Sequence, residues 1–292
     1  MKALAEFAMR SRVHAIGVSA VSAALPPPFF CLSAGVASLV MLRKGPVEGA
    51  LVTLWAVLPA MIWYVVGNPP DPTNVILILG TVSLAYVLRA TLSWALTLGA
   101  AILVGIVAGF SFEFAASELL LAVPEVFLKF NPGLQPQFRA LGTEAVTSLV
   151  VGAVATGQVF LIVMLLALGR WWQSTLVSPG SFQKEFHGLR LPPKLSAAIT
   201  IVALLCFLSG AAALTRWTML IMVPLVVSGI AFVHWLIKAR EWAAGVLIAF
   251  YVVVALLPQA LFPVLAILSV ADSAFDLRPK MNTKAGPPAS QQ

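Results

Sequence analysis

Charged residues are scarce in this sequence, with Asp, Glu, Lys and Arg making up only 10% of the 292 residues. Soluble domains carry about 25% charged and about 45–50% apolar residues, whereas 60% of this chain is apolar. This composition excludes an ordinary soluble domain. Because a membrane-spanning helix takes about 20 apolar residues, the chain has room for about eight to ten membrane segments. We therefore expect an all-α, polytopic membrane protein with a single integral membrane domain over residues 1–271.

Cysteine is equally scarce, and both Cys31 and Cys206 lie inside apolar runs. This excludes a disulfide framework and a zinc site of the usual spacing. The sequence also lacks a Walker phosphate loop, the HExxH and CxxC motifs, and the glycine fingerprint of dinucleotide-binding domains. It has no series of intramembrane carboxylates of the kind that proton pumps use. We therefore expect no metal, no cofactor and no catalytic residue, which means that the protein is not an enzyme.

The net charge of +7 comes from Lys and Arg residues that lie at the ends of apolar runs. Dispersed in this way, they indicate membrane topology rather than nucleic-acid binding. Lys2, Arg10 and Arg12 precede the first apolar run, which places the N-terminus in the cytoplasm. We expect the lipid bilayer as partner and the bacterial cytoplasmic (inner) membrane as location.

Two apolar stretches, 13–42 and 242–270, can each form one or two membrane segments. Pro26 to Pro28 interrupt the first, and Pro258 and Pro263 interrupt the second. Two segments in both places leave only three of the 18 Lys and Arg residues outside the cytoplasm: Lys129, Arg139 and Arg216. The positive-inside rule therefore favours two segments in each stretch and a cytoplasmic tail over 272–292. The composition of its final residues, PPASQQ, predicts disorder.

Residues 111–144 predict an extracytoplasmic cap made of helical pieces along the membrane surface. The charged side chains of the cap either solvate it or bind a small-molecule ligand, and the candidates for ligand contact are Glu113, Glu118, Arg139 and Glu144. Gln158 lies in the middle of the following apolar run. Because an unpaired amide in hydrocarbon is costly, Gln158 must bond either to another helix or to a ligand.

Residues 170–194 form the longest polar connection, and we expect them to lie in the cytoplasm between two membrane-embedded halves. Phe182, Phe186 and Leu189 recur at helical spacing, which predicts a short interfacial helix. The side chains that would anchor this connection or dock a partner are Trp171, Trp172, Phe182, Phe186 and His187. For His187 a purely structural role is the alternative.

The connection also carries a resemblance. The residues Arg170-Trp171-Trp172-Gln173, Pro179-Gly180, Phe182, Glu185-Phe186-His187 and Leu189-Arg190-Leu191, with Ala271-Asp272-Ser273 and Phe275-Asp276 near the C-terminus, make the chain similar to the DUF2232 (YybS-like) bacterial membrane proteins. The chain departs from that pattern at Val177-Ser178 and at Ser181, where Tyr-Asn and a second Gly are expected.

That family is in turn similar in fold to the substrate-binding S components of energy-coupling factor vitamin transporters. The resemblance implies an S-component-like body that binds a small, vitamin-like solute near its outer face and takes energy from another subunit. It also implies a small-residue helix surface for a transmembrane coupling subunit, which Ala15, Ser19 and Ala23 would supply. The alternative is a membrane-anchored interaction or assembly protein that acts through residues 171–191.

Overall fold

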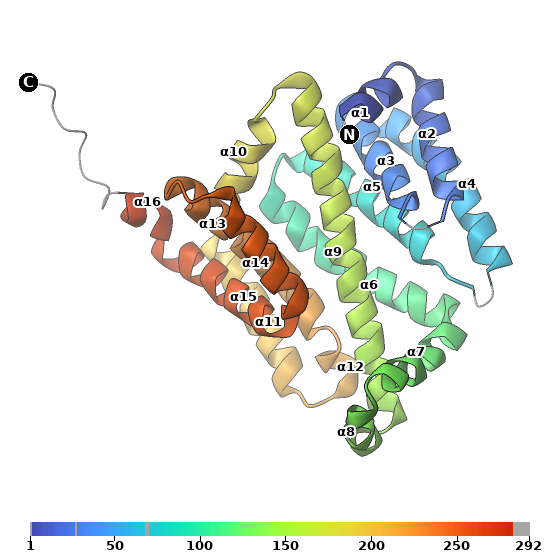
Figure 1. Ribbon diagram of the computed structural model, residues 1–292, viewed down its shortest axis with the longest axis vertical. Helices are drawn as coiled ribbons and strands as arrows, with labels where there is room; N and C mark the ends of the chain where they lie inside the picture. The colour runs from blue at the N-terminus through green and yellow to red at the C-terminus, as the bar shows by residue number, and fades with distance from the viewer. Residues whose placement is uncertain (1, 27, 68–69, 283–292) are drawn as a thin grey trace, which may run out of the picture. The chain divides into compact units, whose positions relative to one another are not determined.

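The computed structural model describes residues 2–26, 28–67 and 70–282, and every regular element within these ranges is helical (Figure 1). The first helices in chain order are α1 (Lys2–Met9), α2 (Arg12–Ala24), α3 (Phe30–Lys44), α4 (Pro46–Val66), α5 (Thr73–Thr91) and α6 (Trp94–Ala115). Then come α7 (Ser117–Phe130), the 3₁₀ turn η1 (Pro132–Leu134), α8 (Gln135–Leu141), α9 (Thr143–Val177) and α10 (Ser181–Gly188). The last are α11 (Pro193–Leu208), α12 (Ala212–Thr215), α13 (Thr218–Ala239), α14 (Ala244–Leu256), α15 (Pro258–Phe275) and α16 (Leu277–Asn282).

Six helical segments of the described chain are long and apolar enough to cross a membrane: α4, α5, α6, α9, α12 with α13, and α15. A seventh is obtained if α10 and α11, which are bent by 62° at their junction, count as one broken span. The helix α14 is apolar but shorter, at 13 residues, and α2 and α3 have 13 and 15 residues. Many large apolar side chains are exposed on the long helices and face lipid. The predicted class, an all-α polytopic membrane protein in contact with the bilayer, is confirmed.

The two ambiguous stretches each form two helices, of which only α15 is long and apolar enough to cross a membrane. Arg12 at the start of α2 pairs with Glu48, which lies just past the end of α3, so α2 and α3 run antiparallel. In the second stretch, α14 ends at Leu256 and α15 begins at Pro258. The Arg278 guanidinium, beyond the end of α15, lies over the ring of Trp235 on α13, so α15 returns to the level of the C-terminal part of α13. The final PPASQQ and Pro27 lie outside the described residues.

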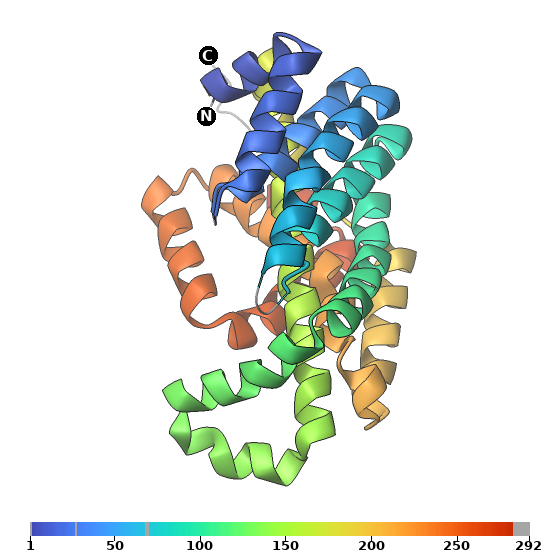
Figure 2. The same ribbon diagram turned by 90° about the vertical axis from the view of Figure 1, so that its right-hand side faces the viewer.

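The chain divides into two compact units. Unit 1 comprises Met1–Phe182 and Ala203–Val223, and unit 2 comprises Gln183–Val202 and Pro224–Gln292. The boundary at 182–183 falls inside the polar connection that the sequence shows between two membrane-embedded halves. In unit 1 the 35-residue helix α9 packs against α3, α5 and α6, and Figure 2 shows α7 and α8 as a lobe beyond the ends of α6 and α9.

Close helix packing depends on glycine at a few positions. A Cβ atom at Gly152 on α9 would overlap the carbonyl oxygen of Arg216, and one at Gly229 on α13 would overlap that of Leu265 on α15. By contrast, a Cβ at Gly157, one turn and a half along α9 from Gly152, would meet open space. Small residues at the contact let two backbones approach where a side chain would hold them apart.

Basic residues gather at one end of each unit. In unit 1, hydrogen bonds join the ends of α5 and α9 to the end of α3, because Arg89 and Gln173 both donate to the Leu42 carbonyl. Seven of the ten Lys and Arg residues of unit 1 lie at this end: Lys2, Arg10, Arg12, Arg43, Lys44, Arg89 and Arg170. In the described part of unit 2, all seven lie near α10, the end of α13 or the end of α15: Lys184, Arg190, Lys194, Lys238, Arg240, Arg278 and Lys280.

Candidate functional site

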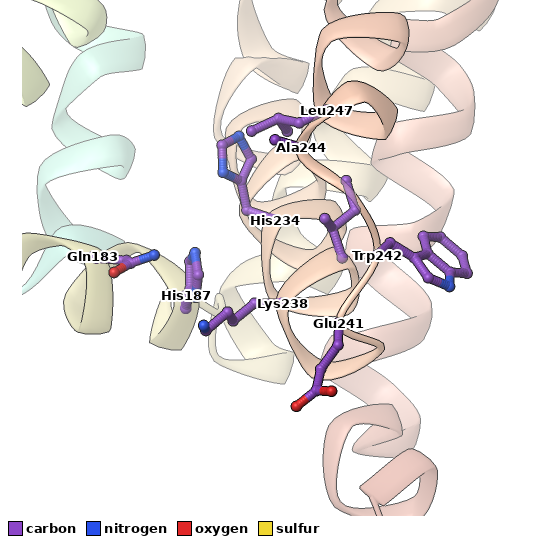
Figure 3. Close-up of a pocket in the computed structure, with 9 residues that line it drawn as sticks. Gln183, His187, His234, Lys238, Glu241, Trp242, Ala244 and Leu247 are labelled. Carbon is purple, nitrogen blue, oxygen red and sulfur yellow. The ribbon is translucent and has the colours of Figure 1, made fainter.

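An open hollow of about 440 Å³ lies in unit 2, between α10, the end of α13 and the start of α14 (Figure 3). Its lining combines polar and apolar side chains: Gln183, His187, His234, Ile237, Lys238, Glu241, Trp242, Ala244 and Leu247. The polar residues come from two separate segments of the chain, α10 and the end of α13 with its turn, so the hollow exists only in the folded protein.

The side chains of Gln183, His187 and Lys238 lie toward one another on one side of the hollow, as Figure 3 shows. Glu241 and Trp242 point away from this group. Among the residues that the structure describes, Lys238 forms no ion pair. The hollow therefore presents an ammonium group without a countercharge, next to an imidazole and an amide that can both donate hydrogen bonds.

His234 is fixed by its own neighbours. Its Nε2 atom lies 2.8 Å from the Tyr251 hydroxyl on α14, within hydrogen-bond distance. The ring of Phe186 meets the His234 ring edge to face, with 5.2 Å between centroids. The His187 ring is 6.2 Å from the same imidazole. His234 thus braces the hollow against α10 and α14, while His187 lies beside Gln183 and Lys238.

The backbone that carries His187 is held by Arg278. This side chain donates to the carbonyl oxygens of His187 and Leu189, the latter at 2.7 Å. Its Nε atom donates to Asp272 Oδ2 at 2.8 Å. The Arg278 side chain is 11% exposed and that of Asp272 only 1%. A buried, charge-assisted network of this kind holds the end of α10 in one position.

A second set of contacts holds the next residues. Arg190 pairs with Asp276 and donates to the Ser273 carbonyl at 3.0 Å, and the Ser273 hydroxyl donates to the Leu191 carbonyl at 2.7 Å. Together with Arg278, these contacts clasp residues 187–191 to the end of α15. We call the group Arg190, Asp272, Ser273, Asp276 and Arg278 the clasp. Its effect is that one wall of the hollow is rigid before any ligand arrives.

The opposite wall depends on the turn that ends α13. Glu241 has φ of +52°, and the Trp242 amide donates to the Ile237 carbonyl at 3.1 Å. This is the hydrogen bond of a Schellman motif, in which glycine usually takes the left-handed position. Here a glutamate takes it, at a steric cost of about 1–2 kcal/mol. Backbone strain of this kind is common at functional sites. In this turn, the side chains of Glu241 and Trp242 point away from Gln183, His187 and Lys238.

The environment of His187 disfavours its charged form. α10 is a polar helix of eight residues, too short to cross a membrane on its own, and it meets the apolar helix α11 at a 62° bend. Partial burial, and secondly the positive charges of Lys238 and Arg278, hold the pKa of His187 below its usual value. At neutral pH the imidazole is therefore uncharged and has one donor and one acceptor nitrogen.

The predicted ligand residues of the cap do not come together. Glu113 forms an ion pair with Arg216, with both carboxylate oxygens 3.1 Å from Nη1, and so has a structural partner. Glu118 and Glu144 are exposed. Arg139 lines a second hollow, of about 660 Å³, together with Glu125 and mainly apolar residues of α7, α8 and α9.

Gln158 is buried on α9, and neither amide atom has a hydrogen-bond partner within the part of the chain that the structure describes. The interhelical bond that the sequence leads us to expect is absent there. Whether Gln158 contacts a ligand remains a prediction, as it does for the four cap residues.

The small-residue surface on α2 is used inside unit 1. Ala15, Ser19 and Ala23 are at most 1% exposed, because α2 packs against α3 and α4. Ala23 belongs to a cluster with Ala34 and Ala56. The face is therefore covered within unit 1, and docking of a coupling subunit at these residues remains a prediction.

The predicted docking residues of the connection lie in different surroundings. Trp172 is fully buried among residues of α1 and α3, which corrects its expected place at the interface, whereas Trp171 is 39% exposed. Phe182 packs against Trp94, with 6.2 Å between ring centroids. Phe186 and His187 belong to the unit 2 hollow and its bracing.

Sequence reasoning identified His187 but missed Gln183, His234 and Lys238. One signal was available for His234, since an ionisable residue inside an apolar run is a candidate for function. Lys238 read only as the basic end of a helix. No pattern in the sequence relates either residue to α10.

Comparisons of this chain with protein-family models, with curated proteins and with solved structures found no match.

Proposed function

We propose that this multi-pass membrane protein binds a small oxyanion at its cytoplasmic surface, in the hollow beside Lys238. The observation that carries the proposal is that Lys238, which forms no ion pair among the described residues, lies with His187 and Gln183 around a hollow in which the clasp fixes the His187 backbone. Because the clasp fixes the backbone of His187 in advance, less entropy is lost when this donor is ordered around an anion.

The chemistry of the hollow fits a phosphate-type group or a carboxylate. A cation and two neutral donors supply the charge and the hydrogen bonds, and Ile237, Ala244 and Leu247 supply an apolar side for the remainder of the ligand. The anion would be either the phosphate of a lipid headgroup or part of a soluble metabolite. Among the described residues that line the hollow there is no Ser, Thr or Cys, so we propose a binding protein rather than an enzyme.

The distribution of charge supports the cytoplasmic placement. Each unit taken separately has its Lys and Arg residues concentrated at one end, and the positive-inside rule assigns that end to the cytoplasm. The hollow lies at the basic end of unit 2. With Cys31 and Cys206 replaced by alanine, a cysteine at Arg240 is expected to react with an impermeant maleimide in inverted membrane vesicles but not in intact cells. Labelling in intact cells but not in inverted vesicles would instead place the hollow on the extracytoplasmic side.

The small-solute binding that the family resemblance implies remains part of this proposal, at a different place. The expected outer site would use the cap, where Arg139 and Glu125 line a hollow but Glu118 and Glu144 are exposed. The hollow in unit 2 has the stronger support, because buried contacts fix the backbone of His187 in its wall. The lining charges of both hollows are exposed.

Binding is tested with the purified full-length protein and two probes. Calorimetry with sulfate measures binding of a free oxyanion to the protein in mild detergent. Native mass spectrometry after reconstitution in phosphatidylglycerol or phosphatidylcholine nanodiscs measures retention of an anionic lipid. We expect Lys238→Gln to lower the affinity for the anion at least tenfold. Arg240→Gln, at an exposed neighbour that does not line the hollow, should leave the affinity unchanged. Sulfate binding without lipid retention indicates a soluble ligand, and the reverse indicates a headgroup. If neither probe binds, or if both variants lose it equally, the proposed site is wrong.

A further inference from the structure

The titratable groups around His187 are three cations, two carboxylates and a second imidazole. From α13 come Lys238 and His234, which both line the hollow, and from α16 comes Arg278, which contacts the His187 carbonyl. On α10 itself, Lys184 and Glu185 are the neighbouring charges. The remaining acidic group of the lining, Glu241, points away from His187 (Figure 3).

While the hollow is empty, the ammonium group of Lys238 therefore opposes protonation of His187. Arg278 is already paired with the buried Asp272, whereas Lys238 has no countercharge among the described residues. An oxyanion placed beside Lys238 would supply that countercharge to both Lys238 and His187. A nearby negative charge favours the protonated form of an imidazole by the same Coulomb interaction that makes a nearby cation oppose it.

Resting on the function proposed above, we infer that the hollow binds its oxyanion together with one proton, which His187 takes from water. The neutral imidazole gains the proton on its free nitrogen, and both ring nitrogens then donate hydrogen bonds. No covalent bond to the ligand forms or breaks. The bound complex holds the anion between an ammonium and an imidazolium, with the Gln183 amide beside them.

His187 rather than His234 is the group that takes the proton. The Nε2 atom of His234 is occupied by the Tyr251 hydroxyl at 2.8 Å, and Phe186 covers its ring. His187 points into the hollow beside Lys238 and Gln183, where an anion would lie (Figure 3). The backbone of His187 is held by Arg278, so the imidazole stays at the site in both protonation states.

The consequence is a site that tightens as the pH falls. Within the range between the pKa of His187 without and with the anion, linkage makes the affinity rise by up to about tenfold for each unit of pH. Above that range the affinity is constant, because the imidazole stays neutral in both states. A membrane protein with this property would hold its anion more firmly in an acidified cytoplasm.

The test is calorimetry of sulfate binding to the full-length protein from pH 5.5 to pH 8, in two buffers whose ionisation enthalpies differ. Sulfate does not titrate in this range, so any proton taken up comes from the protein. We expect the difference between buffers to report about one proton per sulfate in the range where affinity changes. His187→Gln should bind sulfate with an affinity independent of pH and without proton uptake. His14→Gln, a control on α2 of unit 1 that does not line the hollow, should keep both the pH dependence and the proton uptake, and His234→Gln is measured for proton uptake alone.

The outcomes separate this inference from the proposed function. Sulfate binding with no proton uptake by the unaltered protein overturns the inference and leaves the anion site standing. Proton uptake that survives in His187→Gln but is lost in His234→Gln assigns the proton to the wrong histidine and also overturns it. Absence of sulfate binding at every pH, with no retained lipid, overturns the function itself. The two-buffer measurement on the unaltered protein decides the first point even if a variant fails to fold.

Discussion

The ion pair between Asp272 and Arg278 makes a quantitative prediction about the clasp. Replacing Asp272 with Asn leaves the Arg278 guanidinium, which is only 11% exposed, without its carboxylate partner. Breaking a buried ion pair on one side costs about 3–5 kcal/mol of unfolding free energy. Replacing Arg278 with Gln removes the same pair and also the donors to the carbonyls of His187 and Leu189, so we expect a cost of at least that size.

The double variant separates the pair from its surroundings. Because Asp272→Asn with Arg278→Gln leaves no uncompensated charge, its cost should be smaller than the sum of the single costs, by about 1–3 kcal/mol. The assay is reversible unfolding in mixed micelles of mild and denaturing detergent, followed by tryptophan fluorescence. The fold and the detergent composition are the same for all variants, so differences in unfolding free energy report the side chains alone.

The neighbouring pair provides a matched control. Arg190 and Asp276 also join the connection to the end of α15, but their side chains are 30% and 55% exposed. Asp276→Asn should therefore cost only about 0–1 kcal/mol, as exposed ion pairs do. If Asp272→Asn costs no more than Asp276→Asn, or if the two single costs add exactly, the clasp is not a buried network and the argument for a preformed hollow fails.

Three further predictions concern packing and pH. Gly152→Ala should lower the unfolding free energy by about 1–3 kcal/mol, because its Cβ overlaps a backbone carbonyl. Gly157→Ala on the same helix should leave it unchanged, because its Cβ meets open space. Equal effects of the two substitutions in detergent unfolding would contradict this packing. Trp172→Ala should lower the unfolding free energy by about 3–5 kcal/mol, because the side chain is fully buried. Trp171→Ala should lower it by less than about 1 kcal/mol. A larger effect of Trp171→Ala would place Trp172 at the surface. Because the pKa of His187 is lowered in the folded state by burial and nearby cations, the unfolded chain binds more protons below the usual histidine pKa, and stability falls as the pH drops through that range. His187→Gln should reduce this loss when unfolding is compared at pH 5 and pH 7, and an unchanged loss would refute the assignment.

Charge and proline positions predicted the course of the chain through the membrane. Pro258 and the basic residues beyond Asp272 indicated that the chain turns back near its C-terminus, and the structure confirms the return. These signals work because a proline removes a backbone donor and because each hydrophobic run is limited by bilayer thickness. They depend on residues near each other in sequence, so a single chain suffices to read them.

The same signals failed where a side chain is covered by a distant segment. Trp171 and Trp172 look alike in sequence, and tryptophan is typical of the membrane interface. The structure buries Trp172 because α1, through Ala5 and Ala8, packs over α9. Nothing in residues 170–173 records that α1 lies there. The small residues of α2 were read as a free surface for the same reason.

The candidate site was least predictable, because its geometry depends on backbone acceptors. Arg278 finds the carbonyl of His187, 91 residues earlier in the chain, and any residue type would present that carbonyl. The sequence could show a cation near the C-terminus and a histidine in the connection, but not their contact. The one trace it held was the presence of Asp272 at the end of an apolar run, where a buried carboxylate requires a partner.

Rigidity and charge in the hollow have a common origin in the clasp. Arg278 fixes the His187 backbone. Partial burial first, and the charges of Lys238 and Arg278 second, lower the pKa of His187. A wall fixed by a neutral network would be equally rigid but would oppose protonation of the imidazole less, because only burial and Lys238 would then lower the pKa of His187. The use of a guanidinium for this purpose couples the position of the histidine to its charge. For that reason the clasp is expected to determine both how tightly the anion is held and the pH at which it is released.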